Sequence, residues 1–273
     1  MRSGKGLLED IDTCRVNFGE LAIWWLGQHS FIAKAGETII YLDPFLSAKP
    51  ERNVAPFLTP EIITHADYIT GSHDHEDHID RPIWPILAQA SIKAKFILPE
   101  MVKSSFSGVL PDSRLIGLTD GRTVELDEVK VTGIAAAHEF LDRDDASGNY
   151  PYLGFVIEAN GCTFYHSGDT CIYEGLVTKL KQWQLDVVFL PINGRDAKRL
   201  ASGCIGNMTY QEAVDLAGAL APGLTIPAHF DMFPNNMADP RDFADYMQVK
   251  FPTLNYHVCD YAACFVYRGQ GQG

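Results

Sequence analysis

Residues 71–80 read GSHDHEDHID, a polar run whose first apolar side chain is Ile79. His73 and His75 are two positions apart, so on an extended segment they point the same way. Asp77 and His78 are adjacent and diverge unless the chain turns between them. This spacing suits a loop at the end of a strand, where one pair of side chains reaches a first metal ion and the next pair a second. The alternative is a solvated acidic loop with incidental histidines.

The donor atoms of this run indicate the kind of metal. Imidazole nitrogen and carboxylate oxygen without a thiolate favour zinc, manganese or iron(II). A short strand is predicted over 67–70, directly before the run. Loops that carry function sit on such rigid scaffolds, so we expect a functional metal site.

Strand and helix patterns alternate on both sides of this run. Before it, strands are predicted over 22–26, 31–35 and 38–42. After it, a helix is predicted over 79–90, with a start disturbed by Pro82 and Pro85. Further strands are predicted over 95–98, 123–126, 129–137, 152–158, 163–165, 186–191, 224–227, 257–258 and 263–267. Further helices are predicted over 100–109 and 173–183, from a Thr209–Glu212 capping box to about 220, and from Asp239–Pro240 to about 250.

The order of these elements predicts the fold class. Hairpins alternate with helix-and-strand units in both halves, and no Pro/Gly/Ser-rich linker separates the halves. We therefore expect one compact α/β domain over 1–273, with two sheets, outer helices and an N-terminal extension over 1–20.

Composition narrows the range of partners. The chain of 273 residues is 46% hydrophobic and 21% charged, as in an ordinary globular protein. With 22 basic and 35 acidic residues its formal net charge is −13, so we expect no nucleic-acid partner and no anionic membrane partner. The sequence has no signal-peptide pattern and no run of about 18 apolar residues. Its six cysteines form no CxxC pair, which predicts reduced thiols and a cytoplasmic location.

Several motifs give the chain a family resemblance. HDHEDH, residues 73–78, matches the HxHxDH motif of the metallo-β-lactamase superfamily. LDP (42–44), AAHE with His138, HSGDT with Asp169 and IPAHF with His229 follow the order that the superfamily shows. The resemblance runs from about Trp24 to the C-terminal strand, and it implies an αββα four-layer sandwich.

The resemblance also implies a ligand set and a chemistry. It places His73, His75 and His138 on one metal ion. It places Asp77, His78 and His229 on a second, with Asp169 bridging the two. Superfamily members hydrolyse their substrates with a water or hydroxide held between the metal ions. Asp77, His78 and Asp169 would then be the catalytic residues.

Other residues are expected to support this centre. Asp43, in the LDP motif, is expected to fix the metal loop through hydrogen bonds. His29 is expected at the rim of the substrate pocket, although each isolated histidine is more often structural. The polar segment 191–208 carries Asn193, Arg195 and Arg199, which could bind an anionic group of the substrate. A solvated surface loop is the alternative for that segment.

Within the superfamily, WWLG, SHDHEDHID and YHSGD resemble the L-ascorbate-6-phosphate lactonase family. This implies that the chain opens the lactone of a phosphorylated sugar acid and uses two divalent ions, most often manganese, with zinc or iron as alternatives. It also implies a small-molecule substrate and a homo-oligomer. The alternatives are a metal-dependent phosphodiesterase that acts on a small diester, and a metal-binding or regulatory protein without turnover.

Overall fold

The computed structural model describes residues 2–269. Its α-helices are α1 (Gly4–Thr13), α2 (Trp84–Ala90), α3 (Glu100–Lys103), α4 (Leu176–Leu180), α5 (Ala197–Ala201), α6 (Tyr210–Leu220) and α7 (Pro240–Lys250). Its first strands are β1 (Glu20–Trp25), β2 (Phe31–Ala35), β3 (Thr38–Leu42), β4 (Tyr68–Thr70), β5 (Lys95–Pro99), β6 (Leu115–Leu118) and β7 (Thr123–Leu126). The remaining strands are β8 (Val129–Ala135), β9 (Leu153–Ala159), β10 (Cys162–His166), β11 (Val187–Pro191), β12 (Leu224–Ala228) and β13 (Cys264–Arg268).

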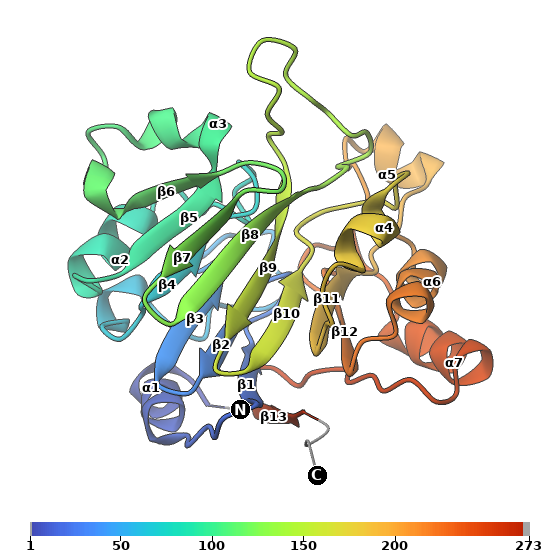
Figure 1. Ribbon diagram of the computed structural model, residues 1–273, viewed down its shortest axis with the longest axis horizontal. Helices are drawn as coiled ribbons and strands as arrows, with labels where there is room; N and C mark the ends of the chain where they lie inside the picture. Colours follow the sequence, from blue (N-terminus) through green and yellow to red (C-terminus); the bar gives the residue numbers. More distant parts are fainter. Residues whose placement is uncertain (1, 270–273) are drawn as a thin grey trace.

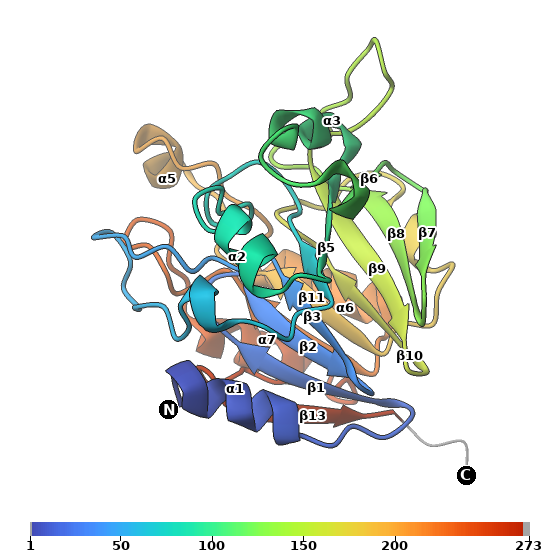
Figure 2. The ribbon, with the colours of Figure 1, turned by 90° about the vertical axis from the view of Figure 1, so that its left-hand side faces the viewer.

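These strands form two sheets that lie face to face between layers of helices (Figure 1). Within the described residues, one sheet has seven strands in the order β13-β1-β2-β3-β4-β5-β6. The other has six, in the order β12-β11-β10-β9-β8-β7. Helices α2 and α3 flank the first sheet, and α4, α6 and α7 flank the second, as Figures 1 and 2 show. This is the predicted αββα sandwich.

The first hairpins show why the strands are buried on both faces. In β1, Leu21, Ile23 and Trp25 belong to the core between the sheets. Their neighbours Ala22 and Trp24 belong to a second core under the outer helices. Because successive side chains of a strand point to opposite faces, an apolar run is the pattern expected of a strand covered on both sides.

Helix α1 lies in the segment predicted to be an extension. Leu7 and Ile11 are fully buried in the outer core. The Trp24 indole donates to Asp10 at 3.0 Å, and the Lys34 ammonium donates to three carbonyls at the end of the helix, among them Cys14 O at 2.9 Å. The N-terminal segment is therefore an integral part of the outer layer. Met1 and residues 270–273 of the predicted domain lie outside the described residues.

Most predicted elements are present, and some are shorter than predicted. The helix predicted over 79–90 begins at Trp84, because residues 75–83 form turns with backbone bonds such as Ile79 N–H to His75 O at 2.7 Å. The helix predicted over 100–109 ends at Lys103 and continues as a 3₁₀ turn. The strand predicted over 257–258 is absent; the neighbouring Tyr256 makes only an isolated bridge to Thr225. Strand β6 and helices α1 and α5 had not been predicted.

The arrangement of the strands brings their ends together. β3, β4 and β5 are parallel neighbours in one sheet, and β10, β11 and β12 are parallel neighbours in the other. Because the carboxyl ends of parallel strands meet at one edge of a sheet, the loops after β4, β10 and β12 approach each other. These loops carry the HDHEDH run, Asp169 and His229.

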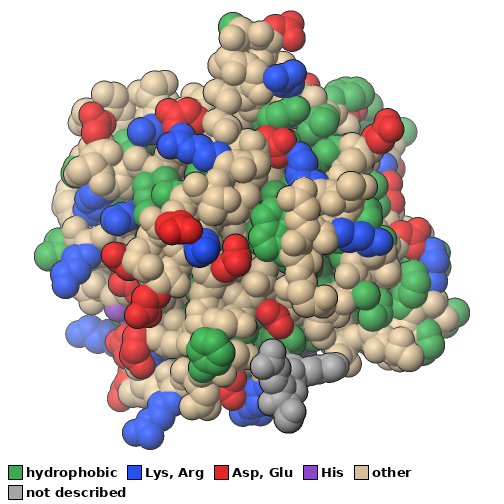
Figure 3. Space-filling view, in the orientation of Figure 1, with side chains coloured by type: hydrophobic (Ala, Val, Ile, Leu, Met, Phe, Trp, Pro, Cys, Tyr) green, Lys and Arg blue, Asp and Glu red, His purple; other side chains and the backbone are tan. Residues whose placement is uncertain are grey.

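Two surface properties complete the description. Acidic and basic side chains are interspersed over the face shown in Figure 3. Among the helices of residues 2–269, none combines the length and the apolar character needed to cross a bilayer.

Candidate metal centre

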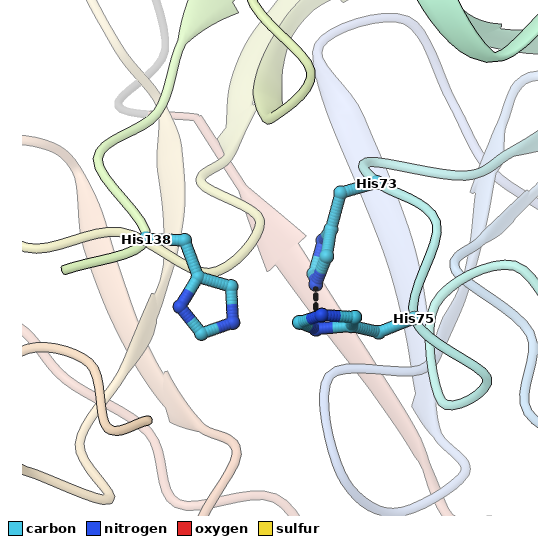
Figure 4. Close-up of side chains that lie close together, drawn as sticks. All are labelled: His73, His75 and His138. Carbon is cyan, nitrogen blue, oxygen red and sulfur yellow. Dashed lines mark hydrogen bonds between the residues drawn. The ribbon is translucent and has the colours of Figure 1, made fainter. Parts of the chain in front are cut away.

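The first cluster consists of His73, His75 and His138. One ring nitrogen of each lies within 4.8 Å of the corresponding atoms of the other two. His73 and His75 follow β4, with a contact of 2.9 Å between His73 Nε2 and His75 Nδ1, whereas His138 faces them from the segment after β8 (Figure 4). Two segments far apart in the sequence therefore build one three-nitrogen site, as predicted.

The second cluster consists of Asp77, His78 and His229, whose ligand-type atoms also lie within 4.8 Å of one another. Asp77 Oδ2 is 3.6 Å from His78 Nε2 and 3.5 Å from His229 Nε2. Backbone bonds from His78 N–H and Ile79 N–H to His75 O turn the chain between the two clusters. This turn lets adjacent residues 77 and 78 converge instead of diverging.

Asp169 lies between the two clusters. Its carboxylate oxygens are 3.7 Å from His138 Nε2, 3.1 Å from His229 Nε2 and 3.3 Å from His78 Nε2. Gly168 sets the approach with a φ of 56°, and a β-carbon there would lie 2.5 Å from the Leu153 carbonyl oxygen. Asp169 therefore contacts histidines of both clusters, and its role as a bridge between two cations stays a prediction.

Asp43 makes hydrogen bonds to the loop after β4 that carries the HDHEDH run, as predicted. Its carboxylate accepts from His78 Nδ1 at 2.8 Å, from Thr70 Oγ1 at 3.0 Å and from the Ser72 backbone N–H at 3.1 Å. The Ser72 hydroxyl also donates to it. With Nδ1 of His78 engaged by a carboxylate, its Nε2 is directed into the second cluster, the arrangement that orients metal-binding histidines.

Burial and charge give the histidines two different protonation preferences. Burial lowers the pKa of His73 well below its ordinary value and lowers that of His138 to about 4, so both are neutral and able to bind a cation. Burial alone would also lower the pKa of His78, but the carboxylates of Asp169 and Asp77 raise it well above its ordinary value. In the same way these carboxylates overcome burial and raise the pKa of His229 to about 9.

Asp77 and Asp169 therefore attract positive charge to the second cluster. Burial would raise both of their pKa values, but His78 and His229 lower them below the usual range. A buried polar atom without a hydrogen-bond partner is rare, yet His78 Nε2 and Asp169 Oδ1 are two such atoms. Two divalent cations would satisfy these atoms, and the nitrogen and oxygen donors fit zinc, manganese or iron(II).

The position of His29 corrects the expectation that it lies at the pocket rim. It is fully buried, its ring lies 4.1 Å from the ring of His166, and its Nδ1 is 3.8 Å from Asp169 Oδ1. Burial lowers its pKa to about 3. His29 lies next to Asp169 in the interior, makes no hydrogen bond to it, and has no surface to offer a substrate.

The residues predicted to bind substrate are engaged with other protein groups. Arg195 forms a bidentate pair with Glu212, with both contacts at 2.6 Å. Arg199 pairs with Asp196 and donates to the Met237 carbonyl. Asn193 is buried and donates to Asn236 at 2.8 Å. An anion-binding role for the arginines stays a prediction.

Gln28 contacts the second cluster, and the sequence analysis did not identify it. Its side-chain nitrogen donates to Asp77 Oδ2 at 2.6 Å and lies 3.1 Å from His229 Nε2. Its backbone N–H donates to Asp231 at 2.8 Å, and its carbonyl accepts from the His229 N–H at 2.9 Å. A glutamine in a hairpin turn carries no recognisable signal, because only the fold brings it to residues 77 and 229.

Both clusters open into a cavity of about 610 Å³, here called the metal cavity. His75, His138, Asp77, Asp169 and His229 lie on its wall. The rest of the lining comes from Glu76 and from three further loops, with Lys49, Glu51, Cys204, Ile205, Phe233 and Asn236 among their residues. A cavity of this size admits a small molecule.

Comparison with known proteins places this centre in a family. Residues 38–230 match the family model described as Beta-lactamase superfamily domain. The chain belongs to the beta-lactamase superfamily. It is 30% identical over 217 residues to a UPF0173 metal-dependent hydrolase of Thermococcus onnurineus, covering 79% of this chain and 87% of that protein. A UPF0173 metal-dependent hydrolase of Pyrococcus abyssi is 28% identical over 221 residues, covering 80% of this chain and 88% of the relative. The chain is therefore a member of the metal-dependent hydrolases of this superfamily.

Solved structures confirm the fold. A metallo hydrolase from Ignicoccus hospitalis aligns with a TM-score of 0.73 at 20% identity, over 92% of this chain and 100% of that one. A diiron β-hydroxylase from Streptomyces venezuelae aligns with a TM-score of 0.66 at 15% identity, over 94% of this chain and 55% of that one. At these identities the likeness concerns the fold alone.

Proposed function

We propose that this metal-dependent hydrolase cleaves a carboxylic ester bond, most readily that of a lactone, in the metal cavity. The observation that carries the proposal is the position of Asp169, whose carboxylate lies within 3.7 Å of histidines from both clusters. His73, His75 and His138 would hold one cation, and Asp77, His78 and His229 the other. Two bound cations supply a hydroxide at neutral pH and polarise the carbonyl oxygen.

Side chains of the protein would carry the proton that moves during hydrolysis. Water adds to the acyl carbon, the ring C–O bond breaks, and the proton lost by the water ends on the ring oxygen, giving a hydroxy acid. Asp77 and Asp169 are the carboxylates at the centre that could carry this proton. Asp77 is the more exposed of the two, with 15% of its side chain accessible against 5% for Asp169.

Covalent catalysis by the protein is a weaker explanation of the cavity. Cys204 carries the one thiol among the described residues of its wall. Burial raises the pKa of this thiol, which keeps it protonated and a poor nucleophile. Hydrolysis by water activated at the metal centre would need no such nucleophile.

The test is a rate comparison on manganese-loaded protein. The substrates are a simple γ-lactone, a phosphorylated sugar lactone and bis(p-nitrophenyl) phosphate, with His78→Ala as the control that removes a second-cluster residue. We expect lactone opening above the metal-free rate and its loss in His78→Ala. Preferential cleavage of the phosphodiester would replace the proposal with the phosphodiesterase alternative. Bound metal without turnover of any substrate would favour a regulatory protein, and wild-type activity in His78→Ala would contradict the ligand assignment.

A further inference from the structure

A second, smaller cavity adjoins the metal cavity. Its volume is about 200 Å³, and it is called the side cavity here. Cys204 and Ile205 lie on the walls of both cavities, so these two residues stand at the boundary between them. Leu200 extends the apolar wall of the side cavity.

Two of the three charged groups of the side cavity, Arg195 and Asp196, are already engaged by the protein, and the third, Glu139, is exposed. Arg195 is held by both carboxylate oxygens of Glu212. Asp196 caps helix α5, accepting from the Arg199 backbone N–H at 2.9 Å, and pairs with the Arg199 guanidinium. These walls therefore offer a ligand the apolar surface of Leu200 and Ile205, beside the carboxylate of Glu139.

Several exposed apolar side chains lie on the segments that follow or precede the residues of the metal centre, and two of them, Leu200 and Ile205, line the side cavity. Within residues 2–269, eleven large hydrophobic side chains are exposed, and six of them lie on the segments that flank the metal centre. These six are Phe140, Leu141, Ile172, Leu200, Ile205 and Met237. The β8–β9 loop, which carries Phe140, rises at the same end of the molecule as α5 in both Figure 1 and Figure 2. Exposed apolar residues scattered singly need no explanation, whereas a group around one cleft marks a binding surface.

The charges of the metal cavity favour a neutral ligand. Lys49 is the one cationic side chain among the described residues on its wall, and it is paired with Glu76 at 2.7 Å. Glu51, Asp77 and Asp169 add negative charge. Two divalent cations would be largely offset by these carboxylates, which leaves little net charge to attract a phosphorylated substrate.

We propose that the side cavity binds the apolar arm of a neutral lactone or ester whose acyl carbon lies at the metal centre. This inference rests on the proposed function and narrows its substrate class. The arm would lie along Leu200 and Ile205, which would hold the acyl carbon at the metal centre.

The experiment measures kcat/KM of the manganese-loaded full chain for γ-lactones whose alkyl arm grows from methyl to octyl. We expect kcat/KM to rise by up to about fourfold per methylene until the side cavity is filled, since burying a methylene is worth roughly 0.8 kcal/mol. Ile205→Asp should flatten this dependence. The matched control is Val249→Asp, an equally conspicuous apolar-to-acid change on α7 at a residue that is 84% exposed, and it should leave the dependence unchanged.

Two results would overturn the inference and leave the proposed function standing. One is a kcat/KM for lactone opening that does not change with arm length, or that changes with arm length in Ile205→Asp as it does in wild-type protein. The other is a kcat/KM for the phosphorylated sugar lactone about tenfold above that of every alkyl lactone, which would assign the opening to an anionic substrate. Light scattering gives the oligomeric state of wild-type protein and Ile205→Asp. If Ile205→Asp converts an oligomer into a smaller species while the dependence on arm length persists, the exposed apolar residues around Ile205 would be an interface between copies of the chain.

A binding measurement separates failure of the inference from failure of the proposed function. The 2-alkylcyclopentanones carry the same arms and contain no ester bond, so their affinity does not depend on turnover. Suppose that no lactone is opened, but that ketone binding tightens with arm length and weakens in Ile205→Asp. This result would support binding of the arm in the side cavity and would overturn ester cleavage as the proposed function. Binding that is independent of arm length overturns the inference.

Discussion

Backbone conformation at single residues marks the metal centre. Gln28, Asp43, Glu139 and His229 all have a positive φ, between 44° and 71°. For residues other than glycine this conformation is uncommon and costs free energy, so it persists only where the surrounding contacts impose it. Here those contacts are identifiable: the Gln28 carbonyl accepts from the His229 N–H, and Asp43 accepts from Ser72 and His78. Four of the eight non-glycine residues with a positive φ among the described residues therefore lie at or beside the metal centre.

Gln28 is expected to position the second cluster. Gln28→Met keeps the length of the side chain and removes its hydrogen bond to Asp77. We expect the affinity for the second manganese ion to fall by about 10–100-fold, the usual cost of losing a group that orients a ligand, with the first ion unaffected. Titration calorimetry measures both sites.

The control for this change is Gln248→Met, which alters an exposed glutamine on α7 that donates to Tyr256. It should leave both affinities unchanged. Equal affinities in wild-type protein and Gln28→Met would show that Asp77 needs no support from Gln28.

Gly168 is expected to be required for the position of Asp169. In Gly168→Ala the new methyl group would lie 2.5 Å from the Leu153 carbonyl oxygen and 2.8 Å from Ser72 Cβ, at a φ of 56°. We expect the free energy of unfolding to fall by about 1–3 kcal/mol and metal affinity to fall with it. Gly175→Ala is the matched control, since Gly175 has a φ of 96° and open space around it. Chemical denaturation and calorimetry of both variants distinguish the clash from backbone strain alone.

At the scale of elements, local patterns decided which predictions were correct. Strands β2 and β3 and helix α7 have the predicted boundaries, because a short apolar run, a tight turn and an Asp-Pro start are local signals. Helix α1 could not be predicted in this way. It contains two glycines and lacks a side-chain cap, and contacts from Trp24 and Lys34 hold it in place. Such contacts are defined only once the sheet has formed.

Helix α6 begins with a capping box formed by Thr209 and Glu212. Thr209 accepts from the Glu212 backbone N–H, and the Glu212 carboxylate accepts from the Thr209 backbone N–H at 2.9 Å. Thr209→Ala removes half of this capping box, and we expect it to lower the free energy of unfolding by about 1 kcal/mol. Thr209→Ser retains the hydroxyl and should cost much less. Urea denaturation of the two variants gives the comparison, and an equal loss in both would assign the effect to the methyl group.

At the scale of the whole molecule, the metal centre draws on loops of both sheets. The side chains that lie together at the centre could be named from the sequence because the HDHEDH run and three short motifs occur in a fixed order, while their binding of metal stays a prediction. The supporting residues Gln28 and Asp231 could not be predicted. They reach the centre through contacts between residues about 200 positions apart in the sequence, such as the hydrogen bond from the Gln28 backbone N–H to Asp231. His29 was misplaced for the same reason. A hairpin turn was expected at the surface, but the second sheet covers it.

The metal centre contains ionisable side chains from loops of both sheets. The free energy of unfolding should therefore depend on pH and on bound metal. In metal-free protein the pKa of His229 is raised to about 9 by Asp169 and Asp77, despite its burial. A raised histidine pKa stabilises the folded state fully below the unfolded value of about 6.5, and this contribution is lost as the pH rises through about 9. The free energy of unfolding of chelator-treated protein should therefore fall between these two pH values.

Manganese-loaded protein should behave differently, because the cation replaces the proton and stabilises the folded state by mass action. Urea denaturation at pH 6.5, 7.5 and 9, with and without manganese, measures both effects. His229→Gln should reduce the pH dependence of the metal-free protein. His257→Gln, which changes a half-buried histidine stacked on Phe265, should leave the decline between pH 6.5 and 9 in place. A metal-free protein whose stability is flat or rises over this range would show that the imidazolium–carboxylate pairs of the second cluster do not form, and that its histidines are held neutral by burial alone.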